Sequence, residues 1–144
     1  MPVPTPAELK KALTAEGFEI YRTTGDRILL ADRVRDNLIM DSGVSVRPDG
    51  GGYSIACIVR LQKSDFPSET DDQLFGRARL LGDPAVARGY AEVSTNAVPV
   101  ADPGDSTRTL DVWYEVAFER SVPAGEDLYA ELRELLKLPK TASR

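Results

Sequence analysis

Three aspartates, Asp32, Asp36 and Asp41, come nearest in this chain to a set for acid/base chemistry. Carboxylates share such work only where their surroundings separate their pKa values, and nothing in the sequence shows that these three converge. The 144 residues include no histidine, so the commonest acid/base group and metal ligand is missing. We therefore predict that the protein is not an enzyme and holds no metal and no cofactor. A hydrolase or isomerase that uses these carboxylates is the third alternative for its function.

Cys57, the one cysteine, lies between Ile55 and Val59 in a run that alternates between core-type and other residues. Without a histidine to take its proton, nothing nearby in the sequence would make a thiolate of it. We expect Cys57 to be a small buried apolar residue. The glycines after Asp49 lead into the same alternating run and not into a helix, so they predict a hairpin turn rather than a phosphate-binding loop.

Charged residues gather in two further places. The acids of the first lack the glycine and the spaced oxygen ligands of a calcium loop, so we interpret them as the acidic start of a helix. They are Asp65, Glu69, Asp71 and Asp72. The second is a set of arginines that could bind an anion, although their alternation with acids favours ion pairs at the surface. They are Arg33, Arg35 and Arg47.

Length and composition indicate an ordinary globular chain. Hydrophobic residues make up 42% and charged residues 28%, and 144 residues suit one domain with one core. We predict a single domain over residues 1–144, of which residues 139–144 form a flexible tail. The net charge of -5 argues against nucleic acid and anionic membranes as partners. A lone cysteine and the lack of a targeting or membrane-spanning segment predict a cytoplasmic protein.

Helix and strand patterns alternate along the chain. A capping threonine, an early proline or early acids, and a closing glycine or proline mark three helices. They cover residues 6–16, residues 69–81, and a stretch between Pro123 and Pro139. Strand patterns cover residues 18–22, 27–34, 37–46, 53–62, 86–98 and 107–121. The fold class is therefore predicted as α+β, an antiparallel sheet with the order helix, strand meander, helix, two-strand hairpin, helix.

The predicted hairpin carries the candidate functional surface. Its two strands flank a turn at Pro103-Gly104, and even-numbered residues from Leu110 to Phe118 predict its core face, so Trp113 points the other way. A symmetric turn brings a partner or dimer surface together from both strands: Arg88, Tyr90, Glu92, Trp113 and Glu115. Aromatic residues beside charged ones are typical of places where proteins meet. The alternatives are a surface covered by the first helix or a loop, and a ligand site.

The order of elements from Pro6 to Leu138, with the small size and the acidity, resembles the type III secretion chaperones and related small bacterial domains. The resemblance implies a non-enzymatic homodimer that binds a segment of a client protein, with the surface around Tyr90 and Trp113 serving dimerisation or client contact. We therefore predict a protein-binding or chaperone-like adaptor module, homodimeric. The alternative is a small-molecule binding domain with a pocket beneath the last helix, for a hydrophobic ligand.

Overall fold

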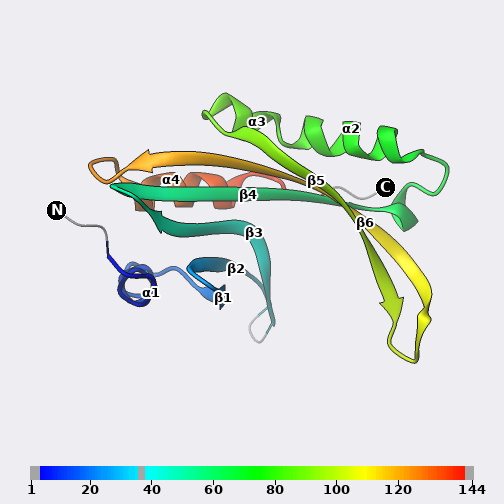
Figure 1. The fold of residues 1–144 in the computed structure, drawn as a ribbon, viewed down its shortest axis with the longest axis horizontal. Helices are drawn as coiled ribbons and strands as arrows, with labels where there is room; N and C mark the ends of the chain where they lie inside the picture. Colours follow the sequence, from blue (N-terminus) through cyan, green and yellow to red (C-terminus); the bar gives the residue numbers. More distant parts are fainter. Residues whose placement is uncertain (1–3, 36–37, 142–144) are drawn as a thin grey trace. The chain divides into compact units, whose positions relative to one another are not determined.

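The computed structural model describes residues 4–35 and 38–141, and within them the chain is a mixed α and β protein (Figure 1). Short-range signals set the ends of its helices: Thr5 and Thr70 each close a capping box, with Glu8 and Gln73. The elements in chain order are α1 (Pro6–Ala15), β1 (Ile20–Thr24), β2 (Arg27–Arg35), β3 (Leu38–Asp49), β4 (Gly52–Gln62), the 3-10 turn η1 (Lys63–Asp65), α2 (Asp71–Leu81), α3 (Asp83–Ala87), β5 (Ala91–Asp102), β6 (Asp105–Pro123) and α4 (Leu128–Lys137).

The strands form one antiparallel sheet in the order β1-β2-β3-β4-β6-β5. The sheet therefore ends at β5, because β6 returns to lie between β4 and β5. The chain divides into two compact units, one of Met1–Cys57 with Glu119–Leu138 and the other of Ile58–Phe118 with Pro139–Arg144. Strands β4 and β6 each contribute to both units, so no linker separates them, and the single domain stays a prediction.

The first unit packs two amphipathic helices on strands β2 and β3. Helix α1 contacts β2 and β3, and α4 contacts β3. Each helix buries the apolar stripe that its sequence predicts, because residues three or four apart share a helix face. The buried residues of this unit include Leu9, Leu13, Ile28, Leu30, Val44, Val46, Ile55, Leu132 and Leu135.

The second unit packs α2 against β6. The rings of Phe75 and Tyr114 meet edge to face with centroids 5.1 Å apart, and the Tyr114 hydroxyl donates a hydrogen bond of 2.6 Å to Asp71. Asp71 stands in the first turn of α2, where the positive end of the helix dipole favours a carboxylate. The buried residues around this contact include Val59, Leu61, Leu74, Ala78, Val116 and Phe118.

Residues 86–90 are not part of a strand, which corrects the predicted order of elements. Asp83–Ala87 forms the short helix α3, and β5 begins only at Ala91. Proline is favoured at the start of a helix, where Pro84 stands, and Gly89 then takes a φ of +96°, a left-handed conformation that glycine adopts without strain. The α+β class and the antiparallel sheet are confirmed, whereas the stated order lacks α3.

Leu110 is 52% exposed, so its prediction as a core residue is wrong. Strand β4 ends at Gln62, and residues 105–110 of β6 are exposed throughout.

The segment after α4 is not a free tail as far as it is described. Lys140 is buried and its carbonyl accepts a hydrogen bond of 2.8 Å from the Arg60 N–H, beside a parallel bridge from Arg60 to Thr141. Residues 142–144 lie outside the described residues.

Candidate functional site

Trp113 and Glu115 lie on one face of β6, as the alternation in the sequence predicts. Both are half-buried, while Tyr114 and Val116 between and beyond them are buried. Arg60 of β4 places its guanidinium 4.5 Å from the centre of the Trp113 ring and donates a hydrogen bond of 2.6 Å to Glu115. At such partly exposed places the cation–π contact and the ion pair each contribute about 1 kcal/mol or less. The Trp113 ring and the Glu115 carboxylate on this face therefore already have a partner within the chain.

Arg88 and Tyr90 are not strand residues and Tyr90 is buried, so their prediction as neighbours on the surface of a strand is wrong. Arg88 follows α3 as its C-cap, and Tyr90 is only 2% exposed. The turn at Gly89 directs Tyr90 inward before β5 begins, which the strand pattern did not indicate. Glu92 is exposed on β5 as predicted, and its carboxylate accepts a hydrogen bond of 2.8 Å from Arg79 of α2. Whether Trp113 and Glu115 contact a partner stays a prediction.

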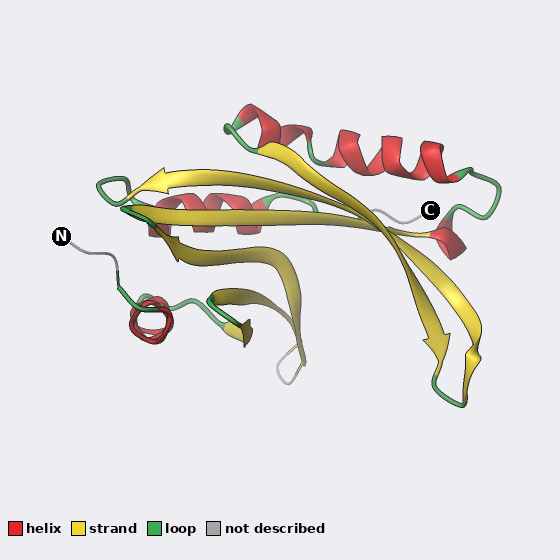
Figure 2. Cartoon of the chain, in the orientation of Figure 1, coloured by secondary structure: helices red, strands yellow, loops and turns green. Residues whose placement is uncertain are grey.

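Strand β5 presents an exposed edge. It is the last strand of the sheet, so one of its edges has no strand beside it among the described residues, and Figure 2 shows it paired with β6 in a long hairpin. All residues from 91 to 99 are exposed, and residues 93–101 carry no charge. Proteins blunt such edges with charges, prolines or covering segments, and here Pro99 is the one such device within that stretch. The unpaired edge can therefore accept a further strand over the residues before Pro99.

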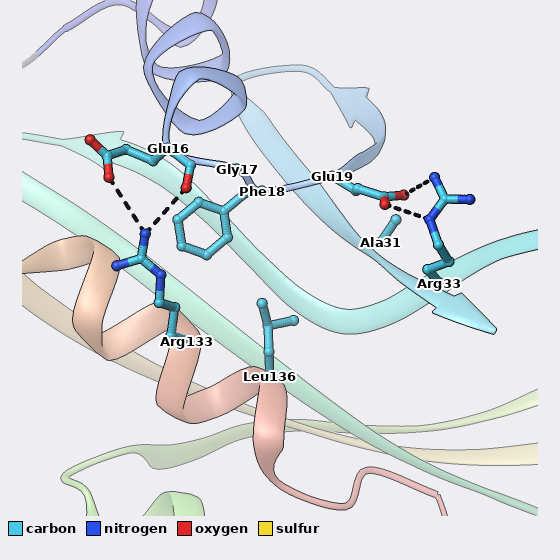
Figure 3. A pocket seen from close by; sticks show the side chains of 8 residues that line it. All are labelled: Glu16, Gly17, Phe18, Glu19, Ala31, Arg33, Arg133 and Leu136. Atoms are coloured by element: carbon cyan, nitrogen blue, oxygen red, sulfur yellow. Dashed lines mark hydrogen bonds and ion pairs between the residues drawn. The ribbon is translucent and has the colours of Figure 1, made fainter. Parts of the chain in front are cut away.

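A pocket opens in the first unit, between the turn after α1, strand β2 and helix α4 (Figure 3). Its volume is about 230 Å³, and Phe18, Ala31 and Leu136 supply the apolar part of a lining that also holds four charged side chains. Two arginines also line the pocket, and each is paired with a glutamate. Arg133 donates to the Glu16 carboxylate, and Arg33 donates to both carboxylate oxygens of Glu19 at 2.7 and 3.0 Å.

A pocket beneath the last helix is one alternative from the sequence, but nothing in the sequence indicates the residues that line this one. Its residues come from three separate stretches of the chain, and only Arg33 belonged to a set that we considered for anion binding. In the structure that arginine is paired with Glu19, which agrees with the expected surface ion pairs. A site of this kind depends on tertiary packing, which brings Arg133 within 3.5 Å of Glu16 across 117 residues of sequence.

The aspartates considered for acid/base chemistry do not converge. Asp32 lies opposite Met40 and Asp41 lies opposite Ala31, so the two carboxylates belong to successive positions and point to opposite faces of β2 and β3. Asp41 accepts a hydrogen bond of 2.9 Å from the Gly43 N–H. Asp36 lies outside the described residues. No group of three metal-binding side chains occurs in the part of the chain that the structure describes.

The other predicted sites have structural roles. Cys57 is buried, as expected. Of the acids near α2, Glu69 pairs with Arg77 and Asp71 accepts from Tyr114, so these carboxylates already have partners. Within residues 4–35 and 38–141, every helix is too short to span a bilayer. Comparisons with protein-family models, with curated proteins and with solved structures each found no match for the chain.

Tyr114→Phe tests the polar contact that holds α2 on the sheet. We expect it to lower the free energy of unfolding by about 1.5 kcal/mol at pH 7, because the hydroxyl donates to a charged acceptor, Asp71. This hydrogen bond, with burial, raises the pKa of Tyr114 to about 12 from its ordinary 10. The neutral phenol is thus favoured in the folded state, and its contribution is complete below pH 10 and lost as the pH rises through about 12.

Urea unfolding between pH 7 and 12 measures this contribution. The difference between wild type and Tyr114→Phe should shrink over the alkaline range, whereas Tyr21→Phe, at an exposed position, should stay within about 0.5 kcal/mol of wild type at pH 7. A difference that does not change with pH would mean that the hydroxyl does not act through Asp71.

Proposed function

We propose that the chain is a non-enzymatic protein-binding module that associates through the outer edge of β5, pairing it with β5 of a second copy. The observation that supports this is the exposed and uncharged stretch of that edge strand, residues 93–99. An added strand would hydrogen-bond to the unpaired backbone groups, while side chains on the two faces decide which strand fits. No catalytic group is needed for this activity.

A second copy suits this edge because residues 93–101 of β5 carry no charge that would repel the same stretch of a second chain. The chain has a net charge of -5, so most of its surface would oppose self-association, and the charged Glu92 at the start of β5 is already paired with Arg79. Antiparallel pairing about an axis between Thr95 and Asn96 places Val93 opposite Val98 of the partner subunit. Such an isologous contact closes as a dimer.

The same edge would suit an extended segment of a client, as the resemblance to the type III secretion chaperones implies. In a dimer paired through β5 that edge is already occupied, so the adaptor would present the Trp113 face to another protein. A cytoplasmic location and the exclusion of nucleic acid belong to the same proposal, and the negative net charge supports the latter.

Val93→Lys tests the pairing. Val93 is 54% exposed, so a lysine there leaves the monomer core intact while it adds a charge to the edge and removes an apolar contact. Light scattering after size exclusion should give wild type a mass of twice 15.7 kDa. The variant should give 15.7 kDa at the same concentration, with a dissociation constant raised about tenfold or more.

Val86→Lys is the matched control. It makes the same change at a 49% exposed valine on α3, away from the strand edge, and it should remain dimeric. Wild type that stays monomeric at about 1 mM would contradict the proposal, since weaker pairing has no use in a cell. Equal loss of the dimer in both lysine variants would place the contact elsewhere than β5.

A further inference from the structure

The pocket beside α4 combines an apolar lining with an arginine whose donors are mostly unused. Arg133 makes hydrogen bonds to described residues from Nη2 alone, to the Glu16 carbonyl at 3.2 Å and to its carboxylate at 3.5 Å. A guanidinium has five N–H donors, so those of Nε and Nη1 have no acceptor among the described residues. Both contacts are long, and both use Nη2, so the Glu16 carboxylate occupies only part of the capacity of Arg133 to bind an anion.

Phe18 lies beside this guanidinium. The central carbon of the Arg133 guanidinium lies 5.1 Å from the centre of the Phe18 ring, and Figure 3 shows that ring between Arg133 and the Glu19–Arg33 pair. A carboxylate that accepts two parallel hydrogen bonds from a guanidinium uses Nη2 together with Nε or Nη1, so a ligand bound in this way shares Nη2 with Glu16. The pocket therefore places the Nε and Nη1 donors of Arg133 beside apolar side chains.

We propose that this pocket binds a small ligand that joins a carboxylate to a flat apolar body. The carboxylate binds the free donors of Arg133, and the apolar body lies against Phe18, Ala31 and Leu136. Arg33 donates two hydrogen bonds to Glu19 and closes the other side of the pocket without serving as the anchor. The ligand class adds an anionic group to the hydrophobic ligand that the sequence suggested.

The size of the pocket limits the ligand. Its volume of about 230 Å³ falls below the roughly 300–1,000 Å³ of sites for drug-sized molecules, which points to a single aromatic ring with a short acid group. Glu16 competes with such an acid because its carboxylate already contacts Arg133. Removing that competitor should tighten binding, and removing Arg133 should weaken it.

Titration of benzoate into the full-length chain, followed by amide NMR, tests the site. We expect saturable shifts at Gly17 and Phe18 with a dissociation constant of about 1 mM, as suits a fragment of this size. Arg133→Gln should weaken binding about tenfold or more, and Glu16→Gln should tighten it about threefold. Lys137→Gln makes the same charge change on an exposed residue of α4 that does not line the pocket, and it should leave binding unchanged.

Uncharged benzyl alcohol should give no saturable shift. Arg133→Lys keeps the charge without the planar guanidinium, so its affinity for benzoate should lie between those of wild type and Arg133→Gln. The proposal is overturned if wild type shows no saturable shift with benzoate. It is also overturned if Arg133→Gln and Lys137→Gln behave alike, or if Glu16→Gln weakens binding. Because the pocket and β5 belong to different units, a negative result here leaves the proposed pairing through β5 to its own test.

Discussion

Replacing Phe118 with Ala should lower the free energy of unfolding by about 3–5 kcal/mol, the usual cost of removing a buried aromatic ring. Phe118 is 2% exposed and is one of the largest fully buried side chains in the part of the chain that the structure describes. Its ring lies so close to Gly82 that a Cβ there would overlap ring atoms Cζ and Cε2. Gly82 stands between α2 and α3, so the ring packs where the two helices meet. Urea or guanidinium unfolding followed by circular dichroism measures the loss.

A double-mutant cycle separates this contact from a general weakening of the core. Gly82→Ala alone should cost about 1–3 kcal/mol, because the new methyl group meets a ring that cannot move freely. In a Phe118→Leu background the overlapping ring atoms are gone, so the cost of Gly82→Ala should fall by about 1 kcal/mol or more. Costs that add to within about 0.5 kcal/mol would show that Gly82 does not accommodate the ring.

Local signals in the sequence predict the helix ends and most strands of this fold. Thr5, Pro6 and Glu8 act within four residues of one another, and the structure begins α1 where they indicate. The alternation that ends at Val59 and Leu61 likewise predicts β4, whose core residues are buried. Patterns of this kind can be read in advance because the groups that interact are close neighbours in the chain.

The errors arise where two local signals compete, or where a distant segment decides the burial of a residue. The small apolar residues 85–87 suit a strand as well as a helix, and the helix signal of Asp83 and Pro84 precedes them. The alternation of apolar residues predicts Leu110 in the core, whereas Leu110 is exposed. An alternating pattern does not show where the neighbouring strand ends. Tyr90 is buried by tertiary packing that follows a single glycine turn.

The two candidate sites differ in how far the sequence foretells them. An exposed edge strand follows from strand order, and the uncharged stretch of β5 is visible in the sequence once its position is known. The residues of the pocket cannot be read from the sequence in this way, since Glu16 and Arg133 are 117 residues apart. Its donors and apolar lining become a site only when α1 and α4 pack on the same strands.

Gly52→Ala should lower the free energy of unfolding by about 2–3 kcal/mol, because its methyl group has no space. A Cβ at Gly52 would overlap the carbonyl oxygen of Val122 and come within 3.1 Å of the Cα atom of Pro123. Both are backbone atoms, which cannot rotate aside as a side chain can, so β4 and β6 would have to separate. Denaturant unfolding measures the loss.

Gly51→Ala is the matched control, since a Cβ there meets nothing within 4 Å. It should change stability by no more than about 1 kcal/mol, in the stabilising direction, because alanine reduces the freedom of the unfolded chain. Equal effects of the two variants would show that β4 can shift away from Val122.

The same experiment tests the single domain: Gly52 belongs to one compact unit and Trp113 to the other. If the two unfold together, Trp113 fluorescence and circular dichroism will shift by the same amount in Gly52→Ala, because β4 and β6 run through both units.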